Sequence, residues 1–147
     1  MQLLDGLTIF STLLMVGVEL AVSLFINPVI WKRDDQAMAT ELAGSLGRVM
    51  PFWYGSCLLL LAAEAFVRRH EAGETELMCA AVLWLFTIIY TIAVLVPINN
   101  RIAASTHTTP SFDWKRQHKR WDTLHRWRIG LLVIAGLAFM SGLHHHS

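Results

Sequence analysis

The chain has 147 residues, of which 54% are hydrophobic and only 16% charged, and its mean hydropathy is +0.46. An ordinary soluble domain carries roughly 25% charged residues, so this composition indicates a membrane protein. The 12 Lys and Arg residues nearly balance the 11 Asp and Glu residues, which excludes a nucleic-acid-binding protein that relies on overall basicity. The long apolar runs exclude an intrinsically disordered chain.

Four apolar runs follow one another along the chain. They cover residues 7–31, 50–67, 77–98 and 121–143. A bilayer core about 30 Å thick needs roughly 20 helical residues per crossing, so four spans use most of the chain. Because lipid cannot satisfy free backbone N–H and C=O groups, each run is predicted to be an α-helix. We expect a single all-α domain, an integral membrane four-helix bundle.

The last helix is predicted to begin well before its apolar part. Residues 102–112 are rich in Ser and Thr and contain a Pro, which indicates a loop. Ser111 or Asp113 is suited to cap a helix that starts at Trp114, and nothing up to Leu143 interrupts the helical pattern. Such an extended last helix is about 45 Å long, so its first turns stand in the headgroup region. No role is assigned to His144–His146, which are native or the remnant of a purification tag.

The basic residues are unevenly distributed between the two ends of the predicted bundle. Ten of the 12 lie between residues 32 and 48 or between 101 and 128, whereas only Arg68 and Arg69 lie at the other end. Because Lys and Arg accumulate on the cytoplasmic side, both termini are expected outside the cytoplasm, in the inner (plasma) membrane of a bacterium. The expected partners are membrane lipid and a small apolar molecule, and no nucleic acid. Gly130 and Gly136 would also allow close approach of a second copy in a homodimer.

The two cysteines and the pair of Glu64 and Arg68 are interpreted as structural rather than functional residues. Cys57 and Cys79 are predicted near opposite ends of their spans, too far apart for a disulfide, and both are expected to be small buried side chains. Glu64 precedes Arg68 by four residues, which predicts a salt bridge at a helix end.

Polar residues within the first span fall on one face of the predicted helix. At about 100° per residue, a single stripe contains Thr8, Thr12, Glu19, Ser23 and Asn27. Glu19 lies near the bilayer midplane, where an ionised carboxylate costs at least a few kcal/mol, so it is expected to face the bundle interior. It either contributes to a pocket or is a neutral side chain that hydrogen-bonds a neighbouring helix.

A second stripe follows the last helix. Trp114, His118, Trp121, His125 and Arg128 recur at spacings of 4, 3, 4 and 3, which place them on one helical face. The alternative to a functional role is an interfacial aromatic belt.

The third span ends in Val96-Pro97-Ile98-Asn99-Asn100-Arg101, where Pro97 is expected to kink or end the helix. The structural alternative there is a helix cap made by Asn, with Arg101 as an interfacial anchor. The first span carries Asn27-Pro28 at the same predicted level, so Asn27, Asn99, His125 and Arg128 are predicted to converge in one site.

These motifs resemble a known family. The segment from Val96 to Arg101, the following Trp114 and Trp121, the sequence His125-Arg126-Trp127-Arg128 and the four-span layout are similar to the anthrone oxygenase-like membrane proteins. The resemblance covers nearly the whole chain and rests on short motifs. It implies O2-dependent oxidation of an anthrone-like substrate without a cofactor.

The chemistry of such a reaction can be assigned to residues. A base removes an acidic C–H proton, donors stabilise the resulting oxyanion, and an apolar aromatic wall holds the substrate. His125 is the expected base, and Asn27, Asn99 or Arg128 are the expected donors. Trp121, Trp127, Asn100 and Glu19 are expected to contact the substrate.

Two other functions remain open. His118, Asp122 and His125 share a helical face and are candidate ligands of a metal-dependent membrane oxidoreductase, although the two histidines are about 10.5 Å apart along the axis. The third possibility is a small accessory or lipid-binding membrane protein without catalysis, which uses its basic end against anionic lipid.

Overall fold

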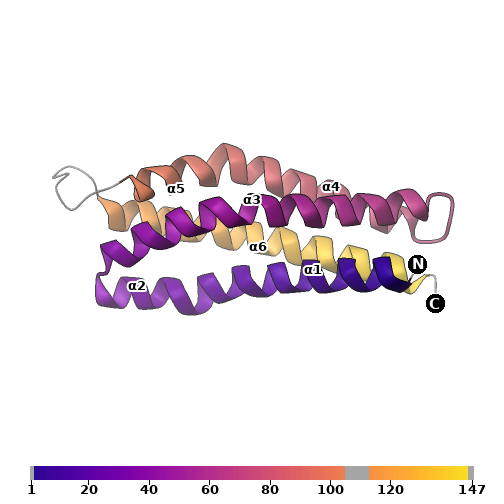
Figure 1. Cartoon of the computed structure of the whole chain (residues 1–147), viewed down its shortest axis with the longest axis horizontal. Helices are drawn as coiled ribbons and strands as arrows, with labels where there is room; N and C mark the ends of the chain where they lie inside the picture. The colour runs from indigo at the N-terminus through magenta and orange to yellow at the C-terminus, as the bar shows by residue number, and fades with distance from the viewer. Residues whose placement is uncertain (1, 105–112, 146–147) are drawn as a thin grey trace.

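The computed structural model describes residues 2–104 and 113–145, which form an antiparallel bundle of four long helical rods (Figure 1). The elements are α1 (Gln2–Ala21), η1 (Val22–Ile26) and α2 (Asn27–Arg33) in the first rod, α3 (Gln36–Val67) in the second, α4 (Glu74–Tyr90), η2 (Thr91–Leu95) and α5 (Val96–Ala103) in the third, and α6 (Trp114–His144) in the fourth. Each rod is long and apolar enough to cross a membrane. The predicted fold, an integral membrane four-helix bundle, is confirmed.

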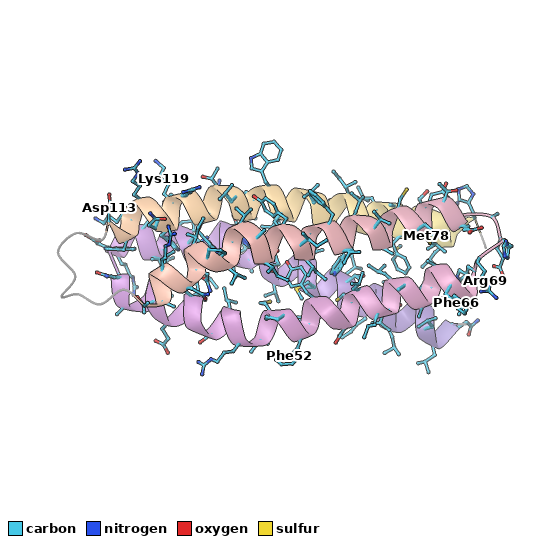
Figure 2. All side chains as sticks on the ribbon, turned by 90° about the horizontal axis from the view of Figure 1, so that it is seen from above. Phe52, Phe66, Arg69, Met78, Asp113 and Lys119 are labelled. Atoms are coloured by element: carbon cyan, nitrogen blue, oxygen red, sulfur yellow. The ribbon has the colours of Figure 1, made fainter. Side chains whose placement is uncertain are left out.

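The last helix has the predicted length and start. The Asp113 side chain accepts a hydrogen bond from the backbone N–H of Arg116 at 3.1 Å and so caps the first turn of α6. The other predicted cap, Ser111, and most of the predicted loop lie outside the described residues, whereas Ile102 and Ala103 belong to α5. Figure 2 places Asp113 and Lys119 at one end of the molecule and Arg69 at the other.

The first connection is much shorter than predicted. Residues 36–49, expected as part of a loop, are the first turns of α3. Asp34 turns the chain with a positive φ of 56°, and Asp35 caps α3 by accepting from the backbone N–H of Met38 at 2.9 Å. This segment is too polar to be recognised as a membrane span, but its Ala39 and Ala43 are buried against the third rod. Packing of one small-residue face therefore extends the helix beyond the apolar run.

Pro97 does not end its helix, contrary to one of the two expectations for it. The third rod continues through Ala103, and it bends near the π-helical turn η2, which precedes Pro97 directly (Figure 1). Proline lacks an N–H and its ring clashes with the carbonyl four residues back, and a wider turn at that point relieves both problems. The first rod repeats the arrangement, with η1 immediately before Asn27 and Pro28.

The apolar core is divided into two clusters along the bundle axis. One contains Met15, Leu61, Trp84, Leu132 and Phe139, and the other contains Val22, Ile30, Ile98, Ile102 and Trp121. Glu19 falls between Met15 and Val22 on the first rod, and Arg128 falls between Trp121 and Leu132 on α6. A polar layer therefore separates the two clusters.

The remaining structural predictions have mixed outcomes. The Nε of Arg68 lies 3.1 Å from a carboxylate oxygen of Glu64, which confirms the predicted salt bridge, and Arg68 also pairs with Asp5. Cys57 is buried, within 3.2 Å of the Ser11 hydroxyl, and no disulfide is formed. The expected burial of Cys79 is wrong, because its face of α4 points away from the other helices and the side chain is exposed.

Candidate functional site

The polar stripe of the first rod faces the bundle interior, as its helical spacing predicts. All five of its members are buried, and the Glu19 residue is only 2% exposed. Their short polar side chains occupy positions at which an apolar residue would otherwise pack against α3 and α6. The stripe thus brings a carboxylate into the polar layer between the two core clusters.

Both carboxylate oxygens of Glu19 are hydrogen-bonded. Arg128 donates from Nη2 to Oε2 at 2.6 Å, and the hydroxyl of Tyr54 donates to Oε1 at 2.6 Å. Charge-assisted bonds of this length are the strong class, and a buried charge needs them to offset the loss of its hydration. Glu19 therefore joins α1, α3 and α6 through one carboxylate.

Arg128 is held from several sides. It is 6% exposed, its Nη1 donates to the Thr91 hydroxyl at 3.3 Å, and its guanidinium carbon lies 5.3 Å from the centre of the Tyr54 ring. Among the described residues, its Nε has no hydrogen-bond partner. The guanidinium is thus fixed in place and keeps one donor that none of the described groups satisfies.

His125 supports this pair. Its Nδ1 lies 2.8 Å from Nη2 of Arg128, and its Nε2 lies 3.2 Å from the backbone carbonyl of Glu19. Because arginine only donates, Nδ1 is the acceptor and the ring is neutral, with its proton on Nε2 and directed at the carbonyl. The ring also stacks on Trp121 at a centroid distance of 4.6 Å. Both nitrogens are engaged inside the protein.

A cavity of about 390 Å³ opens beside this cluster, between α3 and the third rod, with α6 at its inner wall. This volume is within the usual range for small-molecule sites. Its lining is Leu46, Gly47, Met50, Pro51, Tyr54, Ile88, Thr91, Ile92, Leu95, Val96, Asn99, Asn100, Trp121 and Arg128. Pro51, Ile92 and Val96 are exposed, so the cavity opens sideways, towards the lipid-facing surface. Tyr54, Trp121 and Arg128 are buried at its inner end.

The predicted site residues divide among four places. Asn99, Asn100, Trp121 and Arg128 line the cavity, and Asn99 also donates to the Ala43 carbonyl at 2.7 Å. Glu19 and His125 are absent from its lining and contact Arg128, which is part of it.

Asn27 and Trp127 are not brought to the cavity. Asn27 donates to a carboxylate oxygen of Asp122 in a separate buried cluster, and Trp127 is 72% exposed on the outer side of α6. Both positions follow from the register of the helices, because Asn27 lies two turns beyond Glu19 and Trp127 points opposite to the buried face.

The alternative metal ligands have separate partners. Trp31 donates to Nδ1 of His118, Asp122 accepts from Asn27 and pairs with Arg126 at 3.0 Å, and His125 contacts the Glu19 and Arg128 pair. Within the described residues, no three His, Cys, Asp or Glu side chains are arranged to share a metal ion.

Tyr54 and Thr91 are the site residues that sequence reasoning missed. Tyr54 shares a helical face with the buried Cys57, Leu61 and Glu64, so a tyrosine on the inward face of an apolar span was the available signal. Thr91 begins η2, and no local pattern indicates its contact with Arg128.

A family match covers the middle and the C-terminal part of the chain. A sequence model of the family described as anthrone oxygenase matches residues 47–138, more than half of the chain. The matched region contains Tyr54, Thr91, Trp121 and Arg128, whereas Glu19 lies before it. No curated protein and no solved structure matches the chain.

Proposed function

The chain belongs to the anthrone oxygenase family, and from that premise we propose that it oxidises an apolar, enolisable aromatic substrate with O2 inside the membrane. The observation that carries the proposal is the cavity of about 390 Å³ whose inner end presents Arg128 and Tyr54, both bonded to the buried Glu19. The apolar part of the lining suits fused aromatic rings, and the polar end suits one oxygen substituent.

The first step is removal of a proton from the substrate. The acidic hydrogen of the enolisable substrate passes to the Tyr54 oxygen while the Tyr54 hydroxyl proton passes to Glu19, which lies within hydrogen-bond reach. Glu19 becomes neutral and no longer compensates the charge of Arg128. The guanidinium then stabilises the substrate anion, so the total charge of the cluster is unchanged by the step.

The second step is the reaction with O2. The carbanion transfers one electron to O2, the resulting radical pair combines into a C–O bond, and the peroxide anion takes back the proton held by Glu19. The hydroperoxide then loses water and leaves a ketone, so that one CH2 group and one O2 become one C=O group and one water. The substrate supplies all the electrons for this sequence.

The remaining residues have supporting roles. His125 positions Arg128 and Glu19, because its two ring nitrogens contact those residues. Asn99 and Asn100 are donors at the wall of the cavity. By the positive-inside rule the end that carries Lys119 is cytoplasmic, so the lateral opening lies in the cytoplasmic leaflet and both termini lie outside.

The test compares the two tyrosines of the chain. O2 uptake and anthraquinone formation are measured with anthrone in detergent micelles, after subtraction of the rate without protein. Tyr54→Phe is expected to lower the rate at least about 100-fold, the size typical of lost acid–base catalysis, while Tyr90→Phe, at a tyrosine that does not line the cavity, is expected to keep it.

Three results would overturn parts of the proposal. Full activity in Tyr54→Phe together with loss in a folded His125→Ala variant would make the histidine the base. Loss of activity in chelator would indicate a metal-dependent reaction. No O2 uptake with anthrone or a panel of related phenols would favour a binding protein without catalysis.

A further inference from the structure

A second hollow lies on the opposite side of α6 from the cavity, against α2. This groove has a volume of about 520 Å³ and is lined by Trp31, Lys119, Asp122, Thr123, Arg126, Trp127 and Gly130. The proposed oxidation uses none of these residues. The groove combines two cationic side chains with two tryptophans, and small residues keep it open, since a Cβ at Gly130 would meet nothing within 4 Å.

The groove lies at the level of the lipid headgroups. Counted back from the end of α6 at His144, the roughly 20 residues that cross the hydrocarbon core reach to about position 124. Lys119 and Arg126 lie on either side of that level. Between the groove and Met140 the exposed residues of α6 are apolar, such as Ile134 and Leu137, whereas those before the groove are charged.

The cations of the groove are arranged to bind an anion. Arg126 is held by Asp122 at 3.0 Å but keeps 57% of its side chain exposed, so part of its guanidinium remains available. The charge of Asp122 is already matched, because the carboxylate is 3% exposed and also accepts from Asn27 and Ser23. Lys119 then gives the groove a net positive charge.

The two tryptophans complete the site for an amphipathic ligand. Trp31 is fixed at the wall because its Nε1 donates to Nδ1 of His118. Trp127 is exposed beside the same groove, and tryptophan is the side chain that best suits the membrane interface. A phosphate would contact Lys119 and Arg126, and the glycerol and upper acyl chain would lie along the indole rings.

We propose that this groove binds the phosphate of an anionic phospholipid and so holds one lipid between α2 and α6 at the basic end of the bundle. The proposal is independent of the oxidation chemistry. The expected ligand has one phosphate diester, a headgroup with a net negative charge, and attached acyl chains.

Native mass spectrometry of the detergent-purified protein tests it through the apparent Kd of the first bound lipid. Dioleoyl phosphatidylglycerol is expected to bind more tightly than dioleoyl phosphatidylcholine, which has the same chains but no net charge. Lys119→Gln is expected to weaken phosphatidylglycerol binding about 5-fold, and Lys119→Gln with Arg126→Gln about 25-fold. Gly130→Leu fills the groove without changing any charge, and it is also expected to remove the preference for phosphatidylglycerol over phosphatidylcholine.

The control variant, Arg33→Gln with Arg120→Gln, removes the same charge from exposed positions outside the groove and is expected to keep the preference. Equal binding of the two lipids, or equal weakening in the control and groove variants, would overturn the proposal. Complete competition by millimolar glycerol 1-phosphate would also overturn it, because the site would then recognise a free phosphate ester rather than a lipid.

Discussion

Removing one partner of the Glu19 and Arg128 pair is expected to destabilise the protein far more than removing both. Breaking a buried ion pair costs about 3–5 kcal/mol, because the remaining charge stays buried without compensation. Among the described residues, Glu19→Leu leaves Arg128 with the Thr91 hydroxyl and the His125 ring as its hydrogen-bond partners, and it also leaves the Tyr54 hydroxyl without its acceptor. A loss of about 5 kcal/mol is therefore expected for this variant.

The two single variants are expected to differ. In Arg128→Met the remaining Glu19 can take up a proton and become neutral, whereas in Glu19→Leu the guanidinium cannot lose its charge. Arg128→Met is thus expected to lower the free energy of unfolding by about 3 kcal/mol, at the lower end of the range for a broken ion pair. The double variant replaces both charges with apolar side chains. It is expected to lose less stability than either single variant, since replacing a whole buried ion pair by apolar residues often leaves stability unchanged.

The free energy of unfolding is measured by SDS titration in mixed micelles with circular dichroism, where refolding on dilution confirms reversibility. Glu19→Gln is included as the conservative variant and is expected to be more stable than Glu19→Leu, because the amide oxygen still accepts a hydrogen bond. The pairing would be refuted if the loss of stability in the double variant equalled the sum of the losses in the two single variants, because additive effects mean that the two residues do not interact.

Two further predictions concern the other end of the bundle and the orientation of the chain. Gly142→Ala is expected to destabilise the protein by about 1–3 kcal/mol, because its Cβ would lie 2.8 Å from the Leu77 side chain. The control is Gly136→Ala, whose Cβ meets nothing within 4 Å, and it is expected to be neutral or stabilising in the same SDS titration. In a cysteine-free background, a thiol at the exposed Ala72 is expected to react with an impermeant maleimide added outside intact cells, and one at Arg33 only after lysis; the reverse pattern would invert the proposed topology.

The fold was predictable because its main determinants are local. Apolar runs of membrane length indicate the four rods, and the 100° spacing of Thr8 to Asn27 correctly predicts which face of the first rod is buried. The start of α3 was not predictable from hydropathy, because residues 36–49 are held in the helix by packing against the third rod rather than by an apolar run. For Pro97 the sequence left two outcomes open, a kink or a helix end, and the structure shows a bend at the π-helical turn before it with the helix continuing to Ala103.

The candidate site depended on the relative register of two antiparallel helices. Sequence spacing puts Glu19 and Asn27 about 12 Å apart on the first rod but does not say which residue of α6 lies opposite each of them. The structure pairs Glu19 with Arg128 and Asn27 with Asp122, so the register differs by about two helical turns from the one that places Asn27 beside Arg128. Residue types on each face were predictable, and their partners across the interface were not.

The pairing of Glu19 with Arg128 also has a consequence for biogenesis. The two residues are 109 positions apart, so at ordinary translation rates roughly 5 to 20 seconds separate the synthesis of the carboxylate from that of its partner. During that interval the first helix leaves the translocon with a carboxyl group that only a proton can neutralise. A nascent chain that stops before α6 therefore keeps this carboxyl group in the bilayer without the cation that balances it in the complete bundle.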